Sequence, residues 1–256
     1  MAEYRLPGPL CTVLGSFKID TGTLCLGATK PPGPANNARP AQAPKRHKAH
    51  RPKVKAQPAR KSTLTAQDFE AAAKLLGADI SVALVHAFAD VESGGRSGMG
   101  PAGLPVIAYE GHVFRKLTNK AYDADHPLLS YKYVKKAGPE WQQNNKDQAT
   151  AWATLEAAIA LDRDAALQAC SWGMFQVMGF NYKSCGYASA EAFVAAMKAG
   201  EKGQLMAFVG YCKKSPGMVK AMLDKDYAGM ASRYNGKDYG DYDKRIEKAY
   251  RKHGGT

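Results

Sequence analysis

The sequence has no long apolar run. No stretch of about 18 consecutive apolar residues occurs among its 256 residues, which excludes a transmembrane helix on length alone. The apolar residues near the N-terminus are interrupted by Pro7, Gly8, Pro9 and Gly15, so a signal peptide is not expected. If the protein acts outside the cytoplasm, we expect a separate export route to release it.

Cysteine and clustered metal ligands are also scarce. The five cysteines are odd in number and lack C-x-x-C spacing, which argues against a zinc knuckle or a dense disulfide framework. We expect reduced, mostly buried thiols, and Cys11 with Cys25 is the only pair that we suspect of bonding. The six histidines show no H-E-x-x-H or comparable ligand spacing, so we expect no metal site and no cofactor.

Acidic residues are absent from one segment that is rich in Pro, Ala, Lys and Arg. Between Lys30 and Lys61 there are ten Lys or Arg, which leaves only +3 of the formal net charge of +13 for the rest of the chain. The prolines recur too closely for a helix to propagate, and few apolar residues are present to offset the entropy of ordering. We predict a disordered cationic linker over residues 30–62 that is attracted to anionic surfaces.

Such a linker would also suit a nucleic-acid-binding protein, because Lys and Arg neutralise phosphates. The rest of the chain does not favour this function. Its residual charge is small, and its Trp and Tyr residues are not interleaved with a basic stripe. We therefore expect no specific nucleic-acid partner, and salt-dependent DNA binding by residues 63–256 alone would separate the two hypotheses.

The remaining chain divides into a short N-terminal segment and a folded domain. Residues 1–29 are Gly-rich and contain two possible short strands, which would be marginal on their own. Residues 63–256 are predicted to be mainly α with a small β element, whose best strand candidate is Leu104 to Tyr109. Thr65 and Asp68 form a capping-box-like start for the first helix. Helices are expected over 65–77, 80–92, 111–118, 146–169, 189–199, 201–213, 217–223, 226–234 and 241–252.

Glu92 is the strongest candidate for a catalytic residue. It follows Val85 and Phe88 at helical spacing, so the carboxyl group ends an apolar helical stripe. It also lies in the last turn before Gly94, where the helix dipole disfavours negative charge. Both effects favour the protonated form that a general acid requires near neutral pH. Alternatively, Glu92 is a solvated residue at a frayed helix end.

Two later segments combine aromatic and amide side chains. Gln176 lies within the apolar stretch Ser171 to Gly179, where its amide could bind a sugar hydroxyl or acetamido group, or could be satisfied within a core helix. Tyr234 and Asn235 end a predicted helix, where they could bind a glycan or could form an ordinary Asn-Gly cap with a surface Tyr.

The order and type of these segments resemble a known family. Glu92-Ser93, Gly173 to Gln176 and Tyr234-Asn235 resemble the three sequence marks of the goose-type lysozyme and lytic transglycosylase superfamily. More narrowly, five motifs resemble, in order, the N-acetylmuramidase family of phage endolysins over about residues 65–252. Tyr109 and Gly111 depart from the family pattern, in which Phe and Arg are expected. The five motifs are Val91 to Gly95, Tyr109 to Phe114, Asp123 to Pro127, Ser171 to Asn181 and Arg233 to Gly236.

The resemblance implies a lysozyme-like monomer that cleaves the β-1,4 bond between N-acetylmuramic acid and N-acetylglucosamine in peptidoglycan. Glu92 would protonate the leaving oxygen, and Ser93, Gln176, Tyr234 and Asn235 would bind substrate. Glu110 is a candidate for orienting or deprotonating the water, or else it stabilises helix 111–118 through the dipole. If no second carboxylate is suitably placed, the substrate's own 6-hydroxyl would close the ring, as in lytic transglycosylases.

The resemblance also implies where the chain acts. As an endolysin it would remain in the host cytoplasm until a separate export or holin route releases it to the periplasm and cell wall. Residues 30–61 have no counterpart in the family, but their charge predicts that they bind the anionic bacterial envelope, whose lipopolysaccharide phosphates and lipid headgroups attract a polycation. Alternatively, they are only a solubilising spacer.

Overall fold

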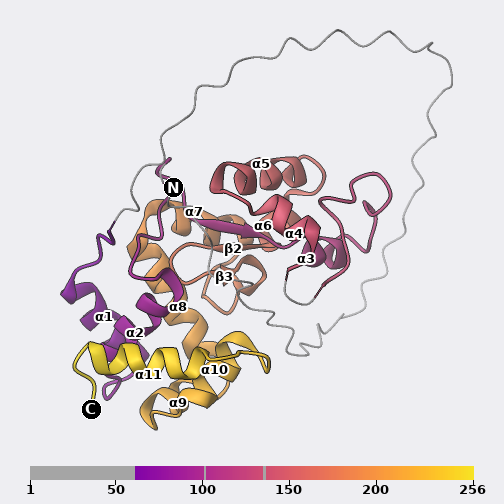
Figure 1. Cartoon of the computed structure of the whole chain (residues 1–256). Helices are drawn as coiled ribbons and strands as arrows, with labels where there is room; N and C mark the ends of the chain where they lie inside the picture. Colours follow the sequence, from indigo (N-terminus) through magenta and orange to yellow (C-terminus); the bar gives the residue numbers. More distant parts are fainter. Residues whose placement is uncertain (1–60, 101, 135–136) are drawn as a thin grey trace, which may run out of the picture. The chain divides into compact units, whose positions relative to one another are not determined.

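The computed structural model describes residues 61–100, 102–134 and 137–256 (Figure 1). These residues are mainly helical and include one small antiparallel sheet, which confirms the predicted fold class for this part of the chain. The predicted N-terminal segment 1–29 and residues 30–60 of the predicted linker lie outside the described residues. The helices are α1 (Ala66–Leu76), α2 (Val82–Ser93), α3 (Gly111–Leu117), α4 (Pro139–Asn144), α5 (Gln148–Ile159), α6 (Arg163–Gln168), α7 (Ala190–Ala199), α8 (Glu201–Lys214), α9 (Met218–Leu223), α10 (Tyr227–Asn235) and α11 (Tyr242–Lys252).

Side-chain caps fix where several helices begin. The predicted capping box of α1 is confirmed, because Asp68 N–H donates to Thr65 and the Asp68 carboxylate accepts from Thr65 N–H. Asp162 caps α6 by accepting from the N–H of Ala165 at 2.9 Å. This cap explains why the single helix predicted over 146–169 is wrong: the chain turns at Leu161 and starts a second helix.

The sheet consists of β1 (Ile107–Tyr109), β2 (Cys170–Trp172) and β3 (Val177–Met178), in that order. β1 pairs with β2 in antiparallel register, with Tyr109 opposite Cys170. The predicted strand therefore exists but begins at Ile107. Its first half is wrong, because Pro105 lacks an N–H donor and makes only an isolated bridge to Met99. Where a core helix was one alternative, at Ser171 to Gly179, the structure has β2 and β3. Neither these two strands nor helix α4 was predicted.

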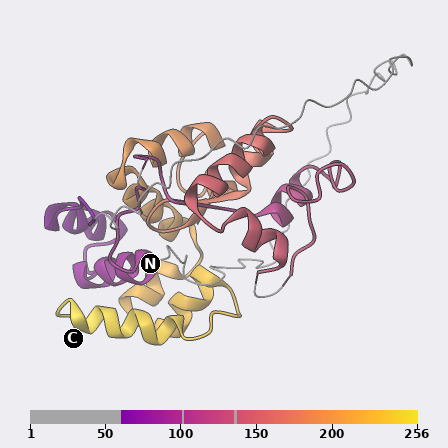
Figure 2. The ribbon, with the colours of Figure 1, turned by 45° about the horizontal axis from the view of Figure 1, so that its top comes forward.

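Helix α2 is covered on two sides by other helices. α1 and α11 both pack on it, and Figures 1 and 2 show α11 running alongside α2. Phe88 of α2 is fully buried and its ring lies 5.2 Å from that of Phe208 in α8. The α2 stripe predicted from the sequence therefore faces the core, and the core holds the C-terminal end of this helix in place.

The folded contacts reach back to the start of the described chain. Lys61 forms a bridge with Arg96, and the Ser62 hydroxyl donates to the Glu201 carboxylate at 2.8 Å. Cys170, Cys185 and Cys212 are free and buried, as predicted, whereas Cys11 and Cys25 lie outside the described residues. None of the helices in the described part has the length and apolar character needed to cross a membrane.

Candidate active site

Glu92 occupies the last turn of α2 and is buried, with 3% of its surface exposed. The alternative of a solvated residue at a frayed end is therefore wrong. Gly94 ends the helix in the left-handed conformation (φ 62°), and its N–H donates to the Asp90 carbonyl. The Ser93 hydroxyl donates to the Ala89 carbonyl at 2.6 Å and accepts from Gly95 N–H at 3.1 Å. Ser93 thus fixes the shape of the turn that carries Glu92.

Tyr242, the first residue of α11, donates a hydrogen bond from its hydroxyl to Glu92 Oε1. Burial raises the pKa of Glu92 to about 7, although this hydrogen bond and the charge of Arg245 pull it down. Near neutral pH a large share of Glu92 is therefore protonated. The group can then give up a proton, as the sequence predicts for a general acid.

Tyr234 and Asn235 end α10 beside this contact. The Tyr234 ring stacks on Tyr242 at 6.2 Å between centroids, and its hydroxyl donates to the Phe175 carbonyl at 2.7 Å. Both Tyr234 and Asn235 are buried, so the alternative of a cap with a surface Tyr does not apply. The structure therefore links the regions of three predicted motifs: Glu92, the turn at Phe175 and Tyr234.

Gln176 lies in the turn between β2 and β3. Its carbonyl accepts from the Ser171 hydroxyl at 2.8 Å, and its amide donates to the Gly173 carbonyl at 2.8 Å. The residue is half-buried and has φ 46°, so a tight turn replaces the core helix considered from the sequence. Gly173 is required there, because a Cβ at this residue would lie 2.4 Å from Gln204 Cδ. The turn thus presents Gln176 with its amide held by its neighbours.

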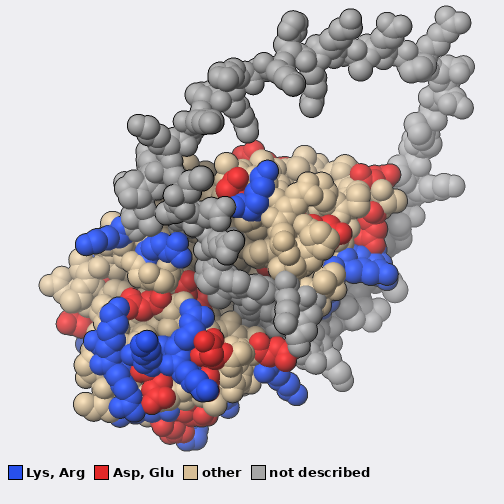
Figure 3. Space-filling view, in the orientation of Figure 1, with Lys and Arg blue, Asp and Glu red and all other residues tan. Residues whose placement is uncertain are grey.

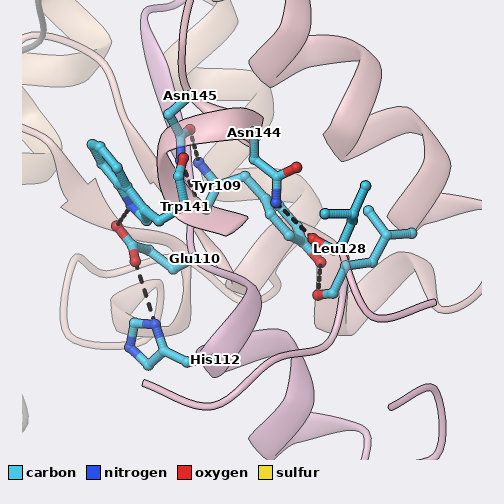
Figure 4. Close-up of polar contacts among 8 residues, drawn as sticks. Tyr109, Glu110, His112, Leu128, Trp141, Asn144 and Asn145 are labelled. Carbon is cyan, nitrogen blue, oxygen red and sulfur yellow. Dashed lines mark hydrogen bonds and ion pairs between the residues drawn. The ribbon is translucent and has the colours of Figure 1, made fainter. Parts of the chain in front are cut away.

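Glu110 lies between β1 and α3, in a separate cluster (Figure 4). Trp141 Nε1 donates to Glu110 Oε1 at 2.8 Å, and His112 Nδ1 lies 3.4 Å from Glu110 Oε2. Burial raises the pKa of Glu110 to about 8 against the opposing hydrogen bond from Trp141. Burial also lowers the pKa of His112 to about 4, so His112 is neutral at pH 7 and supplies no compensating charge. The Glu110 side chain makes no capping hydrogen bond to α3, so Glu110 is not an ordinary helix-capping carboxylate.

The two departures from the family pattern are explained by contacts next to Glu110. The Tyr109 hydroxyl, which Phe would lack, donates to the Leu129 carbonyl at 2.9 Å (Figure 4). A Cβ at Gly111 would lie 2.1 Å from the Tyr131 ring, so a larger residue here would displace Tyr131. Tyr109 thus bonds to, and Gly111 leaves room for, the chain at residues 129–131, which packs beside Glu110.

The two candidate carboxyl groups belong to different contact networks. Neither a hydrogen bond nor an ion pair joins Glu92 to Glu110 among the described residues. On the side of Glu110, the Gln176 amide donates to the Val106 carbonyl at 3.4 Å, just ahead of β1. In the same part of the chain, no group of three or more His, Cys, Asp or Glu side chains is placed to hold a metal ion.

Comparison with known proteins identifies the family. Residues 81–254, more than half of the chain, match the N-acetylmuramidase family. The chain belongs to the N-acetylmuramidase family. It is also similar to a solved structure, described as the crystal structure of Burkholderia AP3 phage endolysin. The two share 36% sequence identity and a TM-score of 0.65, over 78% of this chain and 74% of the endolysin. A comparison with curated proteins gave no match.

The predicted resemblance to phage endolysins of this family is thereby confirmed, and with it the lysozyme-like fold. The enzyme is a peptidoglycan-degrading endolysin of the muramidase type. Sequence reasoning did not find Tyr242, Arg245 or Trp141. The spacing of Tyr242, Ile246, Ala249 and Tyr250 indicates a buried face of α11, but it does not say that this face meets Glu92 about 150 residues earlier.

Proposed function

We propose that the enzyme cleaves the β-1,4 bond between N-acetylmuramic acid and N-acetylglucosamine, with Glu92 as the general acid. The observation that carries this proposal is the burial of Glu92 at the end of α2, which raises its pKa to about 7. A carboxylic acid that is protonated near pH 7 can donate to the leaving glycosidic oxygen, and its carboxylate can later take up a proton.

Glu110 is our candidate for the group that orients or deprotonates the attacking water. It is a second buried carboxyl group, and its two oxygens are oriented by Trp141 and His112. Because its pKa is raised to about 8, it must lose a proton before it can act as a base. Ser93, Gln176, Tyr234 and Asn235 are proposed to bind or frame the glycan beside Glu92.

The alternative reaction is lytic transglycosylation, in which the substrate's 6-hydroxyl replaces water and Glu92 acts first as acid and then as base. The neutral state of Glu110 at pH 7 supports this alternative, because a protonated carboxyl group does not activate water. Family membership supports hydrolysis, which remains our first choice.

Mass spectrometry of the fragments released from purified peptidoglycan tests the proposal. Hydrolysis of the muramic acid bond leaves reducing muramic ends, whereas transglycosylation leaves 1,6-anhydro ends. Cleaved stem peptides with intact glycan strands would contradict both reactions and would indicate an amidase.

We further propose that residues 30–61 bring the enzyme to anionic surfaces of the bacterial envelope, and that degradation serves host cell lysis after a separate export or holin route. Support for the first part is the charge of the segment, which has ten Lys or Arg and no acid. The nucleic-acid alternative gains no support from the face shown in Figure 3, where Lys and Arg are interspersed with Asp and Glu.

A further inference from the structure

Tyr242 makes the single side-chain hydrogen bond that the Glu92 carboxyl group has among the described residues. The Tyr242 ring is buried, stacks on Tyr234 with an interplanar angle of 12°, and lies 6.4 Å from the Phe88 ring. Rings on three helices therefore fix where the hydroxyl points. A donor held in this way orients the Glu92 carboxyl group before any substrate arrives.

Arg245 lies one turn further along α11. Its Nη2 donates to the Val91 carbonyl at 2.8 Å, and its guanidinium lies 5.9 Å from the centre of the Tyr242 ring. Val91 precedes Glu92 in the C-terminal turn of α2, where unpaired carbonyl groups carry partial negative charge. Arg245 thus places a positive charge where the helix end and burial both disfavour a carboxylate.

Other charged groups nearby are engaged elsewhere. Asp90, on the same helix as Glu92, pairs with Lys252 at 2.7 Å and with His253 at 2.9 Å, at the far end of α11. Tyr234, from α10, directs its hydroxyl to Phe175. The described groups that act on the charge of Glu92 are therefore Tyr242 and Arg245, in opposition to burial.

We propose that Tyr242 and Arg245 are positioning residues of the reaction, which orient the Glu92 carboxyl group and stabilise its charged form. This inference rests on the proposed role of Glu92. A general acid must be protonated when substrate binds and charged once the leaving oxygen has taken the proton. Burial alone would favour the first state at the expense of the second. The contact with α11 supports the second state, so the same carboxyl group can serve both steps.

The test compares Tyr242→Phe with Tyr250→Phe, since each removes one hydroxyl from a buried ring of α11. Among the described residues, the Tyr250 hydroxyl bonds only to the Thr256 carbonyl, at 3.3 Å. The first readout is the pH at which kcat/KM falls on the alkaline side. The second is the pKa of Glu92 from ¹³C NMR, where the Glu92 signal is the one that is missing in Glu92→Gln. We expect Tyr242→Phe to raise the Glu92 pKa by about one unit and to move the alkaline limb to higher pH, because it removes a hydrogen bond to the charged form. Tyr250→Phe should leave both unchanged.

Arg245 provides a second and independent pair of variants. Arg245→Gln should raise the same two values, and Arg245→Lys should raise them less because it keeps the charge. At pH 8, a shift of one unit would raise the protonated share of Glu92 about fivefold.

Unchanged values in folded Tyr242→Phe and Arg245→Gln enzymes would overturn the inference. If Tyr242→Phe fails to fold, the two Arg245 variants decide it. The NMR measurement does not depend on activity, so it separates this inference from the proposed function. A shifted Glu92 pKa together with an active Glu92→Gln enzyme would disprove the general acid and, with it, the catalytic role of the two residues.

Discussion

At the scale of single residues, burial is the largest influence on the protonation of both candidate carboxyl groups. Tyr242 and Arg245 oppose the effect of burial at Glu92, whereas among the described residues Glu110 has beside it the neutral donor Trp141 and the neutral His112. The pKa is about 7 for Glu92 and about 8 for Glu110. The Glu92 acid therefore loses its proton at a lower pH than the proposed Glu110 base.

These two values predict the pH dependence of kcat/KM. Activity should fall above about pH 7 as Glu92 loses the proton that it must donate. If Glu110 is the base, activity should also fall below about pH 8 as Glu110 gains a proton, which gives a narrow bell with its maximum between these values. Glu110→Gln should then lower kcat by about 100-fold and remove the acidic limb. A wild-type profile that is flat below pH 7 would contradict the base role of Glu110.

Part of the site was predictable at this scale. The spacing of Val85, Phe88 and Glu92 places the carboxyl group at the buried end of one helix, and the structure agrees. The partners of Glu92 were not predictable, because Tyr242 reaches it only through tertiary packing of α11 on α2. For Gln176, a core helix was one alternative from the sequence, and no turn was predicted. The observed turn gives Gln176 a positive φ and brings Gly173 so close to Gln204 that a Cβ would clash, and the sequence does not show this tertiary packing.

At the scale of elements, aromatic stacking at His86 joins α1, α2 and the end of α11, in the half of α2 that does not carry Glu92. His86 of α2 stacks on Phe69 of α1 at 3.6 Å and on His253, just after α11, at 4.9 Å. Burial and the nearby His253 lower the pKa of His86, although Asp90 opposes this. The stack therefore favours a neutral His86 in the folded enzyme.

This stack predicts acid sensitivity. Because the folded-state pKa of His86 lies below its ordinary value of 6.5, the unfolded chain takes up a proton first as the pH falls. The neutral state of His86 therefore contributes to stability above about pH 6.5, and this contribution is lost as the pH falls below that value. His86→Phe should keep the stack and reduce the fall in Tm between pH 7 and pH 5. His126→Phe is the matched control, and an equal fall in the wild type and His86→Phe would contradict the account.

Secondary structure was predictable where local chemistry defines it. The capping box of α1 and the apolar face of α2 lie within a few residues of the elements that they define. The break between α5 and α6 depends on one cap at Asp162. β2 and β3 were missed because strands of three and two residues carry too few alternating positions to be recognised, and they form only by pairing with β1.

At the scale of the whole molecule, Glu201 ties the start of the described chain to the loop after α2. Its buried carboxylate accepts from Ser62, Thr63, Ser97 and the N–H of Gly98. Burial would raise the pKa of Glu201, but these hydrogen bonds hold it below the usual value. Substitutions that test the preceding basic segment should therefore leave residues 61–63 intact.

The positive charge of residues 30–60 predicts a salt-dependent affinity for the outer membrane. Replacing its nine Lys and Arg between Lys30 and Arg60 by Gln should weaken binding to outer-membrane vesicles at low salt at least about tenfold. Activity on purified peptidoglycan should be retained. About 0.3 M salt should weaken binding of the wild type to a similar degree, because it shortens the range of charge interactions. Equal binding by the two proteins at low salt would show that the segment has no such role.

The most direct test of the central claim is the rate at which Glu92→Gln releases muropeptides from purified peptidoglycan. Circular dichroism checks the fold, and Glu156→Gln, at an exposed position on α5, is the matched control. We predict at least about a 100-fold loss for Glu92→Gln, because general acid catalysis contributes about 10² to 10⁴ in rate, and no loss for the control. A folded Glu92→Gln enzyme that releases muropeptides at nearly the wild-type rate would contradict the assignment of Glu92 as the acid.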